Sequence, residues 1–224
     1  MPVTALEKEL LEKGLAELNT GGAQNDNIVK LLSRYIDEIE LFNPAYGLVK
    51  VQDRRELIVK HILDSLAPLD ILRRLHENPR IADVGSGAGL PGIPLAVCMP
   101  GAEFTLVERM GRRAGFLRNV QAVLALANVR VEEAEMERLP PACFDIVVFR
   151  AFRPLEPDIY KGLSRLLAPG GFLAAYKGRR ESLAEEMSRL LDKLNKGTAA
   201  AWEALPLKVP FLEDPRHLLL IRQD

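Results

Sequence analysis

The sequence predicts an α/β protein with a mostly parallel seven-stranded sheet, an antiparallel C-terminal hairpin and an N-terminal helical extension. From residue 80 onward, short β-rich segments alternate with amphipathic helical segments, which is typical of parallel strands joined by crossover helices. Before residue 76 only helical periodicity occurs. Two β-rich segments near the end of the chain are too close together for a crossover helix, so they should pair antiparallel.

The N-terminal extension is predicted to begin with two helices. Thr4 stands three residues before Glu7, the spacing of a capping box, and leucines recur at helical intervals over residues 4–19. The glycine pair at residues 21–22 is expected to end this helix. Asp26 is expected to cap the second helix.

The second helix is expected to stop at Asn43-Pro44, because proline restricts the residue before it. Asp53 and Glu56 form a second capping-box pattern ahead of a longer helical segment. Pro68 is predicted to break that segment.

The sheet and its helices follow in regular order from residue 80. The predicted strands are residues 80–84, 103–108, 129–132, 145–149, 172–176, 202–209 and 217–222. The predicted helices are residues 92–99, 111–127, 156–168 and 181–196. Pro169-Gly170-Gly171 is predicted to form a turn before the fifth strand.

Size and composition indicate an ordinary globular chain. Its 224 residues fit a helical extension over residues 1–75 and one domain over residues 76–224. The formal net charge of -1 provides no global basic field, so any nucleic-acid site must be a local patch. The N-terminus lacks the apolar core of a signal peptide and no apolar run is long enough to span a membrane, which favours the cytoplasm. Cys98 and Cys143 show no metal-ligand spacing and are expected to be buried, reduced thiols.

The central motif is the segment RIADVGSGAGLPG, residues 80–92. It predicts a strand, a glycine turn and the N-terminus of a helix in succession. Glycine accepts positive φ and lets a ligand approach bare backbone, while a helix N-terminus presents unpaired N–H groups. We therefore expect a nucleotide-like cofactor here.

Two cofactor classes compete for this motif. Residues 87–92 fit the dinucleotide pattern G-x-G-x-x-G, and residues 83–89 fit D-x-G-x-G-x-G of methyltransferases. The Asp83 carboxylate would repel a diphosphate but suits the cationic S-adenosylmethionine. Glu108, at the end of the second strand, serves a ribose in either case, whereas the turn at residues 169–171 is common in methyltransferases. Together these features favour S-adenosylmethionine and a Rossmann-like class I methyltransferase fold.

A longer set of motifs is more specific than the glycines. In order and spacing they resemble the bacterial RsmG family, also called glucose-inhibited division protein B, over roughly residues 28–180. The motifs are KHILDSL at 60–66, DVGSGAGLPGIPLA at 83–96, FTLVERMGRRAGFLRNV at 104–120, FDIVVFRAF at 144–152 and AAYKG at 174–178. The resemblance implies an S-adenosylmethionine-dependent rRNA (guanine-N7) methyltransferase acting on guanine 527 in the decoding-region loop of 16S ribosomal RNA. Its expected partner is 16S ribosomal RNA or the small-subunit particle.

The resemblance also implies site residues. Gly85 and Leu90 match cofactor contacts, Met136 and Glu137 match an adenine-side pair, and Arg150 matches an arginine at the mouth of the site. The candidate cofactor-binding residues are therefore Gly85, Gly87, Leu90, Glu108, Glu135, Met136, Glu137 and Arg150. The chain departs from the family pattern at Gly47, Val49 and Phe149, and at residues 135–138, where the family commonly has Arg-Ala-Glu-Glu.

An RNA-binding rim is predicted from position. Ligands of open α/β sheets bind outside the carboxyl ends of the strands, and cations follow three of these ends. They are Arg109, Arg112 and Arg113 after the second strand, Arg150 and Arg153 after the fourth, and Lys177, Arg179 and Arg180 after the fifth. The candidate RNA-binding residues are Lys60, His61, Arg112, Arg150 and Lys177. The simpler alternative is that these are solvated loop and helix-start charges.

Methylation at guanine N7 sets modest chemical demands. N7 carries a free lone pair and loses no proton, so a general base is not required and no catalytic acid or base is expected. Positioning of the base is then the main requirement. Phe149, Phe152 and Tyr176 are candidates to stack on a flipped-out or single-stranded guanine, with core packing an equal alternative for Phe149.

Two alternatives remain open from the sequence. The chain would be a methyltransferase of a small molecule or a protein, or a non-catalytic nucleotide-binding module. No metal site and no obligate protein partner are indicated, and a monomer is compatible with the sequence.

Overall fold

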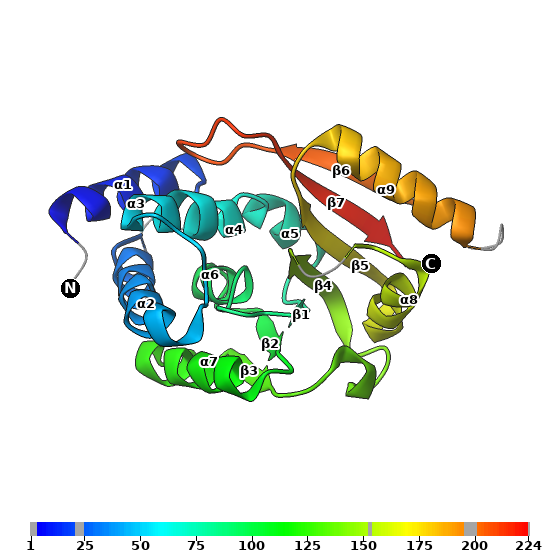
Figure 1. Ribbon diagram of the computed structural model, residues 1–224, viewed down its shortest axis with the longest axis horizontal. Helices are drawn as coiled ribbons and strands as arrows, with labels where there is room; N and C mark the ends of the chain where they lie inside the picture. The colour runs from blue at the N-terminus through cyan, green and yellow to red at the C-terminus, as the bar shows by residue number, and fades with distance from the viewer. Residues whose placement is uncertain (1–3, 21–24, 152–153, 195–200, 224) are drawn as a thin grey trace.

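The computed structural model of this chain describes residues 4–20, 25–151, 154–194 and 201–223. It contains one seven-stranded sheet in the order β3-β2-β1-β4-β5-β7-β6 (Figure 1). The strands are β1 Arg80–Val84, β2 Glu103–Val107, β3 Val129–Glu132, β4 Phe144–Arg150, β5 Leu167–Lys177, β6 Trp202–Leu207 and β7 Arg216–Arg222. Strands β1 to β5 are parallel, and β7 runs antiparallel to both β5 and β6. The predicted fold class and C-terminal hairpin are confirmed.

The helices cover both faces of this sheet (Figure 1). They are α1 Ala5–Glu17, α2 Asn25–Tyr46, α3 Arg54–Leu57, the π-helix η2 Ile58–Leu63, α4 Asp64–Leu66, α5 Leu69–Leu75, α6 Gly92–Cys98, α7 Gly111–Leu124, the 3₁₀-helix η3 Met136–Arg138, α8 Pro157–Leu166 and α9 Arg180–Lys193. No described helix combines the length and apolarity needed to cross a membrane.

Alternate residues of the central strands enter two hydrophobic cores. In β4, Ile146 and Val148 face the core shared with α2, α6 and α7, whereas Val147 and Phe149 face the core shared with α8 and α9. A parallel strand covered by helices on both faces is expected to be apolar on both sides. This burial fixes the register of β4 and thereby the place where its carboxyl end emerges.

The N-terminal helices pack directly on the sheet. Leu11 of α1, Leu32 of α2 and Leu57 of α3 belong to the same buried cluster as Phe104 and Leu106 of β2. Thr4 and Glu7 form the predicted capping box of α1. The break predicted at Pro68 is confirmed, because α5 begins at the next residue.

Three local predictions about the helical extension need correction. Asp26 lies in the first turn of α2 rather than capping it, and α2 continues past Pro44 to Tyr46. Pro44 has no amide to donate to the carbonyl four residues earlier, but helical bonding resumes after it, since the Gly47 amide donates to the Asn43 carbonyl at 2.9 Å. The Asp53–Glu56 capping box is half formed, since the Glu56 carboxylate accepts from the Gln52 amide at 2.7 Å. The glycine pair at 21–22 lies outside the described residues.

The predicted turn at residues 169–171 lies within β5 instead. Phe144 pairs with Leu167 and Ile146 pairs with Phe172, so four residues of β5 lie opposite one residue of β4 and the strand bulges between these two pairs. Gly170 adopts φ +74°, which suits such an irregularity. Cys98 is buried as expected, but Cys143, in the turn just before β4, is only half-buried.

Candidate functional site

The glycine motif forms a tight loop between β1 and α6. Gly85, Gly87 and Gly89 all have positive φ, between 60° and 93°. Asp83 holds the loop, because its carboxylate accepts from the Ser86 hydroxyl at 2.7 Å and from the Gly92 amide at 2.9 Å. A Cβ at Gly92 would lie 2.6 Å from this carboxylate, so only glycine fits.

Asp83 lies beneath the glycine loop and its known contacts are with that loop. Its side chain is fully buried and does not line either of the cavities described below. Burial raises the pKa of Asp83 to about 6. That this carboxylate favours a cationic cofactor stays a prediction.

Glu108 ties the glycine loop to the end of β2. Its buried carboxylate accepts from the Gly87 amide at 3.0 Å and from the Met110 amide at 2.8 Å. Two backbone donors fix the orientation of the carboxylate, and each oxygen keeps a lone pair for a further donor. Such a carboxylate suits the hydroxyl groups of a ribose.

Glu108 faces a first cavity of about 380 Å³. The cavity lies at the carboxyl ends of β1 and β2, where ligands of open α/β sheets bind. Its lining residues are Val84, Gly85, Val107, Glu108, Arg109, Met110, Arg113, Ala134, Glu135, Met136, Glu137 and Ala151.

The first cavity contains five of the eight predicted cofactor residues: Gly85, Glu108, Glu135, Met136 and Glu137. The other three are placed elsewhere. Gly87 does not line the first cavity, but its amide donates to the Glu108 carboxylate. Leu90 is buried in the hydrophobic core, because the loop turns inward after Gly89. Arg150 lines a second cavity.

The second cavity has a volume of about 770 Å³ and touches the first. Ala151, at the end of β4, lines both and has a left-handed φ of +49°, which is strained for a residue with a Cβ. The other lining residues are Lys60, His61, Asp64, Phe149, Arg150, Pro154, Tyr176, Lys177, Gly178, Ser182, Glu186, Arg189, Leu207, Arg216 and His217.

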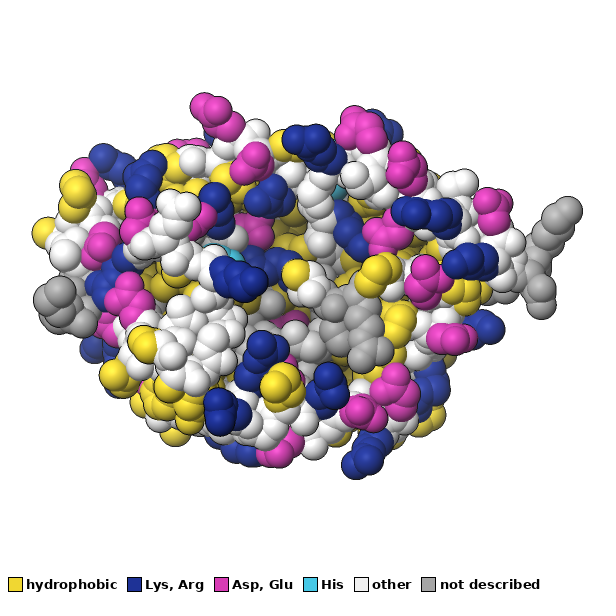
Figure 2. Space-filling view, in the orientation of Figure 1, with side chains coloured by type: hydrophobic (Ala, Val, Ile, Leu, Met, Phe, Trp, Pro, Cys, Tyr) yellow, Lys and Arg dark blue, Asp and Glu magenta, His cyan; other side chains and the backbone are white. Residues whose placement is uncertain are grey.

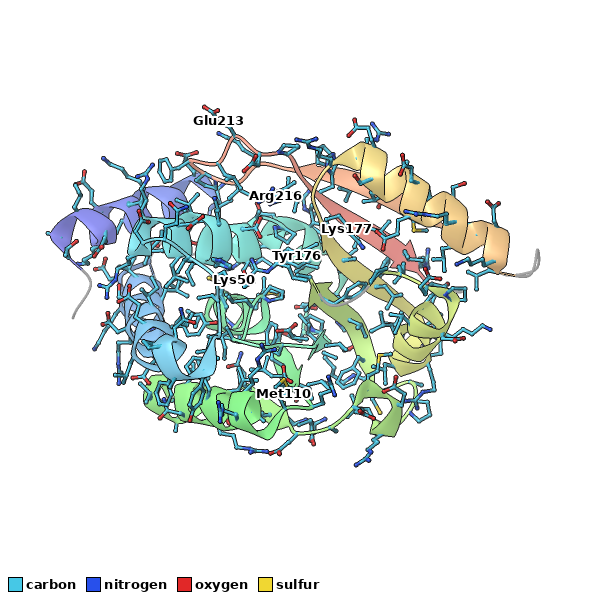
Figure 3. All side chains as sticks on the ribbon, in the orientation of Figure 1. Lys50, Met110, Tyr176, Lys177, Glu213 and Arg216 are labelled. Atoms are coloured by element: carbon cyan, nitrogen blue, oxygen red, sulfur yellow. The ribbon has the colours of Figure 1, made fainter. Side chains whose placement is uncertain are left out.

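Figure 2 shows Lys and Arg side chains gathered around the hollow at the centre of one face. In Figure 3, Tyr176, Lys177 and Arg216 lie together on one side of this hollow, and Met110 lies across from them. Four of the five predicted RNA-binding residues, Lys60, His61, Arg150 and Lys177, line the second cavity. The fifth, Arg112, lies outside it, with its guanidinium 5.6 Å from the centre of the Tyr46 ring.

Arg150 belongs to a buried polar network in the second cavity. It donates to the Asp64 carboxylate at 2.9 Å and to the Lys60 carbonyl at 3.4 Å, and it lies 3.2 Å from the His61 ring. Asp64 also accepts from Arg216 at 3.0 Å. Burial and the Arg150 charge lower the pKa of His61 to about 4, so this histidine is neutral at pH 7.

The π-helix η2 contributes a backbone carbonyl to this network. A π-turn departs from regular helical hydrogen bonding, and such turns are frequent at functional sites. Here the Lys60 carbonyl accepts from Arg150, and just beyond η2 the Ser65 carbonyl accepts from Tyr176 at 2.7 Å. The helical periodicity of the sequence contains no signal for this local change.

Several predicted rim cations are already paired. Lys177 contacts both carboxylate oxygens of Glu186 at 2.7 Å, and Lys60 contacts Glu56 at 2.6 Å. The rim is therefore less uniformly basic than the sequence suggested. Arg153 and Phe152 lie outside the described residues.

Three cations around the hollow are not neutralised by a carboxylate of the described residues, and two of them, Arg109 and Arg113, line the first cavity. Lys50, Arg109 and Arg113 make no salt bridge within the part of the chain that the structure describes. Lys50 and Arg109 are exposed, and Figure 3 places Lys50 beside the hollow. Lys50 was missed from the sequence, because it lies on a loop between α2 and α3 rather than after a strand.

The predicted aromatic residues occupy the wall of the second cavity. Phe149 is almost wholly buried, so core packing accounts for most of its surface. Tyr176 is fixed by its hydrogen bond to the Ser65 carbonyl. Among the described residues no group of His, Cys, Asp and Glu side chains is suited to hold a metal ion.

Comparison with known proteins gives a consistent result. A family model described as rRNA small subunit methyltransferase G matches residues 28–217. A protein of that name from Treponema pallidum strain Nichols is 40% identical over 224 residues, covering 98% of this chain and 96% of the relative. One from Salmonella agona is 36% identical over 207 residues, covering 92% and 94%.

Solved structures share the fold at lower identity. A putative S-adenosylmethionine-dependent methyltransferase from Methanococcus maripaludis has a TM-score of 0.56 and 16% identity, covering 84% of this chain and 91% of its own. A predicted O-methyltransferase from Agrobacterium tumefaciens has a TM-score of 0.55 and 26% identity, covering 72% and 80%.

Proposed function

Because this chain belongs to the rRNA small subunit methyltransferase G family, we propose that it methylates N7 of guanine 527 in 16S ribosomal RNA. The chain is an S-adenosylmethionine-dependent rRNA methyltransferase of the small subunit. The observation that supports the finer assignment is that two cavities meet at Ala151. One is suited to the nucleoside part of the cofactor, and the other to one nucleotide of an RNA chain.

We assign the first cavity to the cofactor. The positive-φ glycine at position 85 exposes backbone to it, Glu108 offers oxygens to the ribose hydroxyls, and the buried Met136 offers an apolar surface to the adenine. Glu135 and Glu137 flank Met136 in the cavity wall. When bound, S-adenosylmethionine supplies a methyl group on a positively charged sulfur.

We assign the second cavity to the acceptor nucleotide. Arg150, Lys177 and Arg216 give it positive charge near the RNA backbone, and Tyr176 provides an aromatic wall. Lys60 and His61 complete the side formed by η2. Lys50, Arg109 and Arg113, together with Arg112 beside the Tyr46 ring, extend the positive surface beyond the cavity, where neighbouring phosphates would lie.

The chemistry proposed for the residues is positioning. Guanine N7 attacks through its own lone pair, so no side chain needs to remove a proton. In the second cavity His61 is a weak base, because its pKa is about 4 and its ring nitrogen Nδ1 lies 3.2 Å from the Arg150 guanidinium. The residues need only hold the base against the methyl group and exclude water.

The organisation of the chain is proposed along the same lines. Residues 1–75 are an extension built onto the methyltransferase domain of residues 76–224, and α1, α2 and α3 share its core. The extension also supplies Lys60, His61 and Asp64 to the second cavity. The substrate of the whole chain is 16S ribosomal RNA, free or in the small-subunit particle. The chain acts in the cytoplasm and needs no obligate protein partner.

The test is nucleotide mapping. Ribosomal RNA from cells that lack this protein should lose 7-methylguanine at position 527, and expression of the intact chain should restore it. Primer extension after borohydride and aniline cleavage reports this modification. Loss of the methyl group at another nucleotide would revise the target. Ribosomal RNA with the same methylation in cells with and without the protein would contradict the proposed substrate.

A further inference from the structure

The second cavity contains a carboxylate that phosphate binding does not explain. Glu186 of α9 lies in the wall of this cavity, and its side chain is 19% exposed. A carboxylate repels phosphate, so its presence among lysine and arginine side chains points to a ligand group that donates hydrogen bonds.

Glu186 is held in place from two sides. Lys177, at the end of β5, contacts both of its oxygens at 2.7 Å, and the Leu155 amide donates to Oε1 at 2.7 Å. Lys177 is also mostly buried, with 17% of its side chain exposed. The lysine and the glutamate therefore present a donor and two acceptors side by side at a fixed place.

We propose that Lys177 and Glu186 select guanine as the acceptor base, an inference that rests on the proposed function. The Watson–Crick edge of guanine carries O6, an acceptor, followed by the N1–H and N2–H donors. Lys177 would donate to O6, and Glu186 would accept from N1–H and N2–H. Enzymes that act on extruded bases commonly read this edge.

Pairing of the guanine edge with Lys177 and Glu186 explains why guanine would be preferred to adenine and why its N7 would stay accessible. Adenine presents an amino donor where guanine has O6 and an acceptor at N1, so it would face Lys177 and Glu186 with the wrong groups. N7 lies on the other side of O6, away from Glu186, and remains free to accept a methyl group. When the base binds, the hydrogen bonds between Lys177 and Glu186 are replaced by hydrogen bonds to the base, so neither side chain is left unpaired.

The experiment compares nucleotides that differ by one group. The intact chain, saturated with S-adenosylhomocysteine, is titrated with GMP, IMP and AMP, and binding is followed by NMR chemical shifts. IMP lacks only the 2-amino group of guanine. Since a hydrogen bond to a charged group is involved, GMP should bind at least about tenfold more tightly than IMP, and AMP more weakly still.

The decisive variant is Glu186→Gln. Its amide oxygen still accepts from Leu155, so the loop before α8 keeps its anchor, but the amide nitrogen cannot accept from guanine. We expect GMP and IMP to bind this variant within about threefold of each other. The matched control is Glu156→Gln, which removes an exposed carboxylate paired with Lys193 and should keep the preference of the unaltered protein.

The outcomes separate the two proposals. Equal behaviour of GMP and IMP with the unaltered chain, whether both bind or neither does, would overturn the role of Glu186, as would a preference that survives in Glu186→Gln. Mapping of 7-methylguanine in ribosomal RNA tests the proposed function independently of this ratio. A chain that methylates guanine N7 but does not distinguish GMP from IMP would leave the proposed function standing and refute the base-reading pair.

Discussion

Replacement of Asp64 by asparagine should destabilise the protein and weaken methylation together. Asp64 is the only carboxylate that Arg150 and Arg216 contact among the described residues, and 7% of its side chain is exposed. Removing one partner of a buried ion pair costs about 3–5 kcal/mol. Because the two arginine side chains retain 14% and 26% exposure, we expect a loss of about 2–3 kcal/mol here.

This loss is measurable by thermal unfolding. In a chain of 224 residues, 1 kcal/mol shifts the melting temperature by about 2–4 °C, so Asp64→Asn should lower it by about 5–10 °C. Methylation should fall as well, since both arginines lose their fixed orientation in the second cavity. Urea denaturation at pH 7.5 provides an independent measure of the same free energy.

A control variant distinguishes this effect from a general loss of charge. Glu133→Gln breaks an ion pair with Arg118 whose side chains are 49% and 42% exposed, and it should change the free energy of unfolding by less than about 1 kcal/mol. A shift below about 2 °C for Asp64→Asn would refute the reasoning. So would a shift equal to that of the control.

Three further predictions concern the glycine loop and His61. Gly92→Ala should lower the free energy of unfolding by about 1–3 kcal/mol, because its Cβ would collide with the Leu106 side chain and the Asp83 carboxylate. Gly115→Ala, on the helix α7 with nothing near its Cβ, should raise that free energy by about 1 kcal/mol, and urea denaturation compares the two variants. Gly85→Asp should abolish calorimetric binding of S-adenosylhomocysteine, since a charged side chain would enter the first cavity at a position with φ +72°; unchanged affinity would show that the cofactor lies elsewhere. The folded-state pKa of His61, about 4, lies below its ordinary 6.5, so the unfolded chain binds more protons between these values. The stability of the unaltered protein relative to His61→Gln should therefore rise from pH 4 to 6.5 and then level off, and a flat difference would contradict the assignment.

The sheet was predicted well from the sequence, because each strand, turn and helix that builds it is encoded by residues close together in the chain. Apolar strands, glycine turns and amphipathic helices each leave a signal within a few residues, and the two strands of the hairpin are close in sequence. The glycine loop and Glu108 were predicted for the same reason, since both follow directly from a strand end.

The charge state of the site was harder to predict. Whether Lys177 is a free cation depends on Glu186, which lies on a separate helix, and whether Arg150 is free depends on Asp64, which is 86 residues away in the sequence. Neither pairing leaves a periodic signal. Position after a strand predicted the location of these side chains but not their partners.

The π-helix and the bulge in β5 were missed because they are irregularities in otherwise regular segments. Both depend on tertiary contacts: the Lys60 carbonyl meets Arg150, and the extra residues of β5 lie opposite the start of β4. Hydrophobic periodicity predicts the segment in each case, but it contains no information about one altered turn.

The excess of cations around the second cavity has a consequence for turnover. Lysine and arginine side chains outnumber carboxylates in its wall. If the acceptor atom is N7, methylation converts a neutral guanine into a cation at the moment the sulfur of the cofactor becomes neutral. If the second cavity binds the acceptor nucleotide as proposed, the wall that would attract the RNA backbone would then oppose the methylated base, so the same electrostatic field would favour both entry and product release.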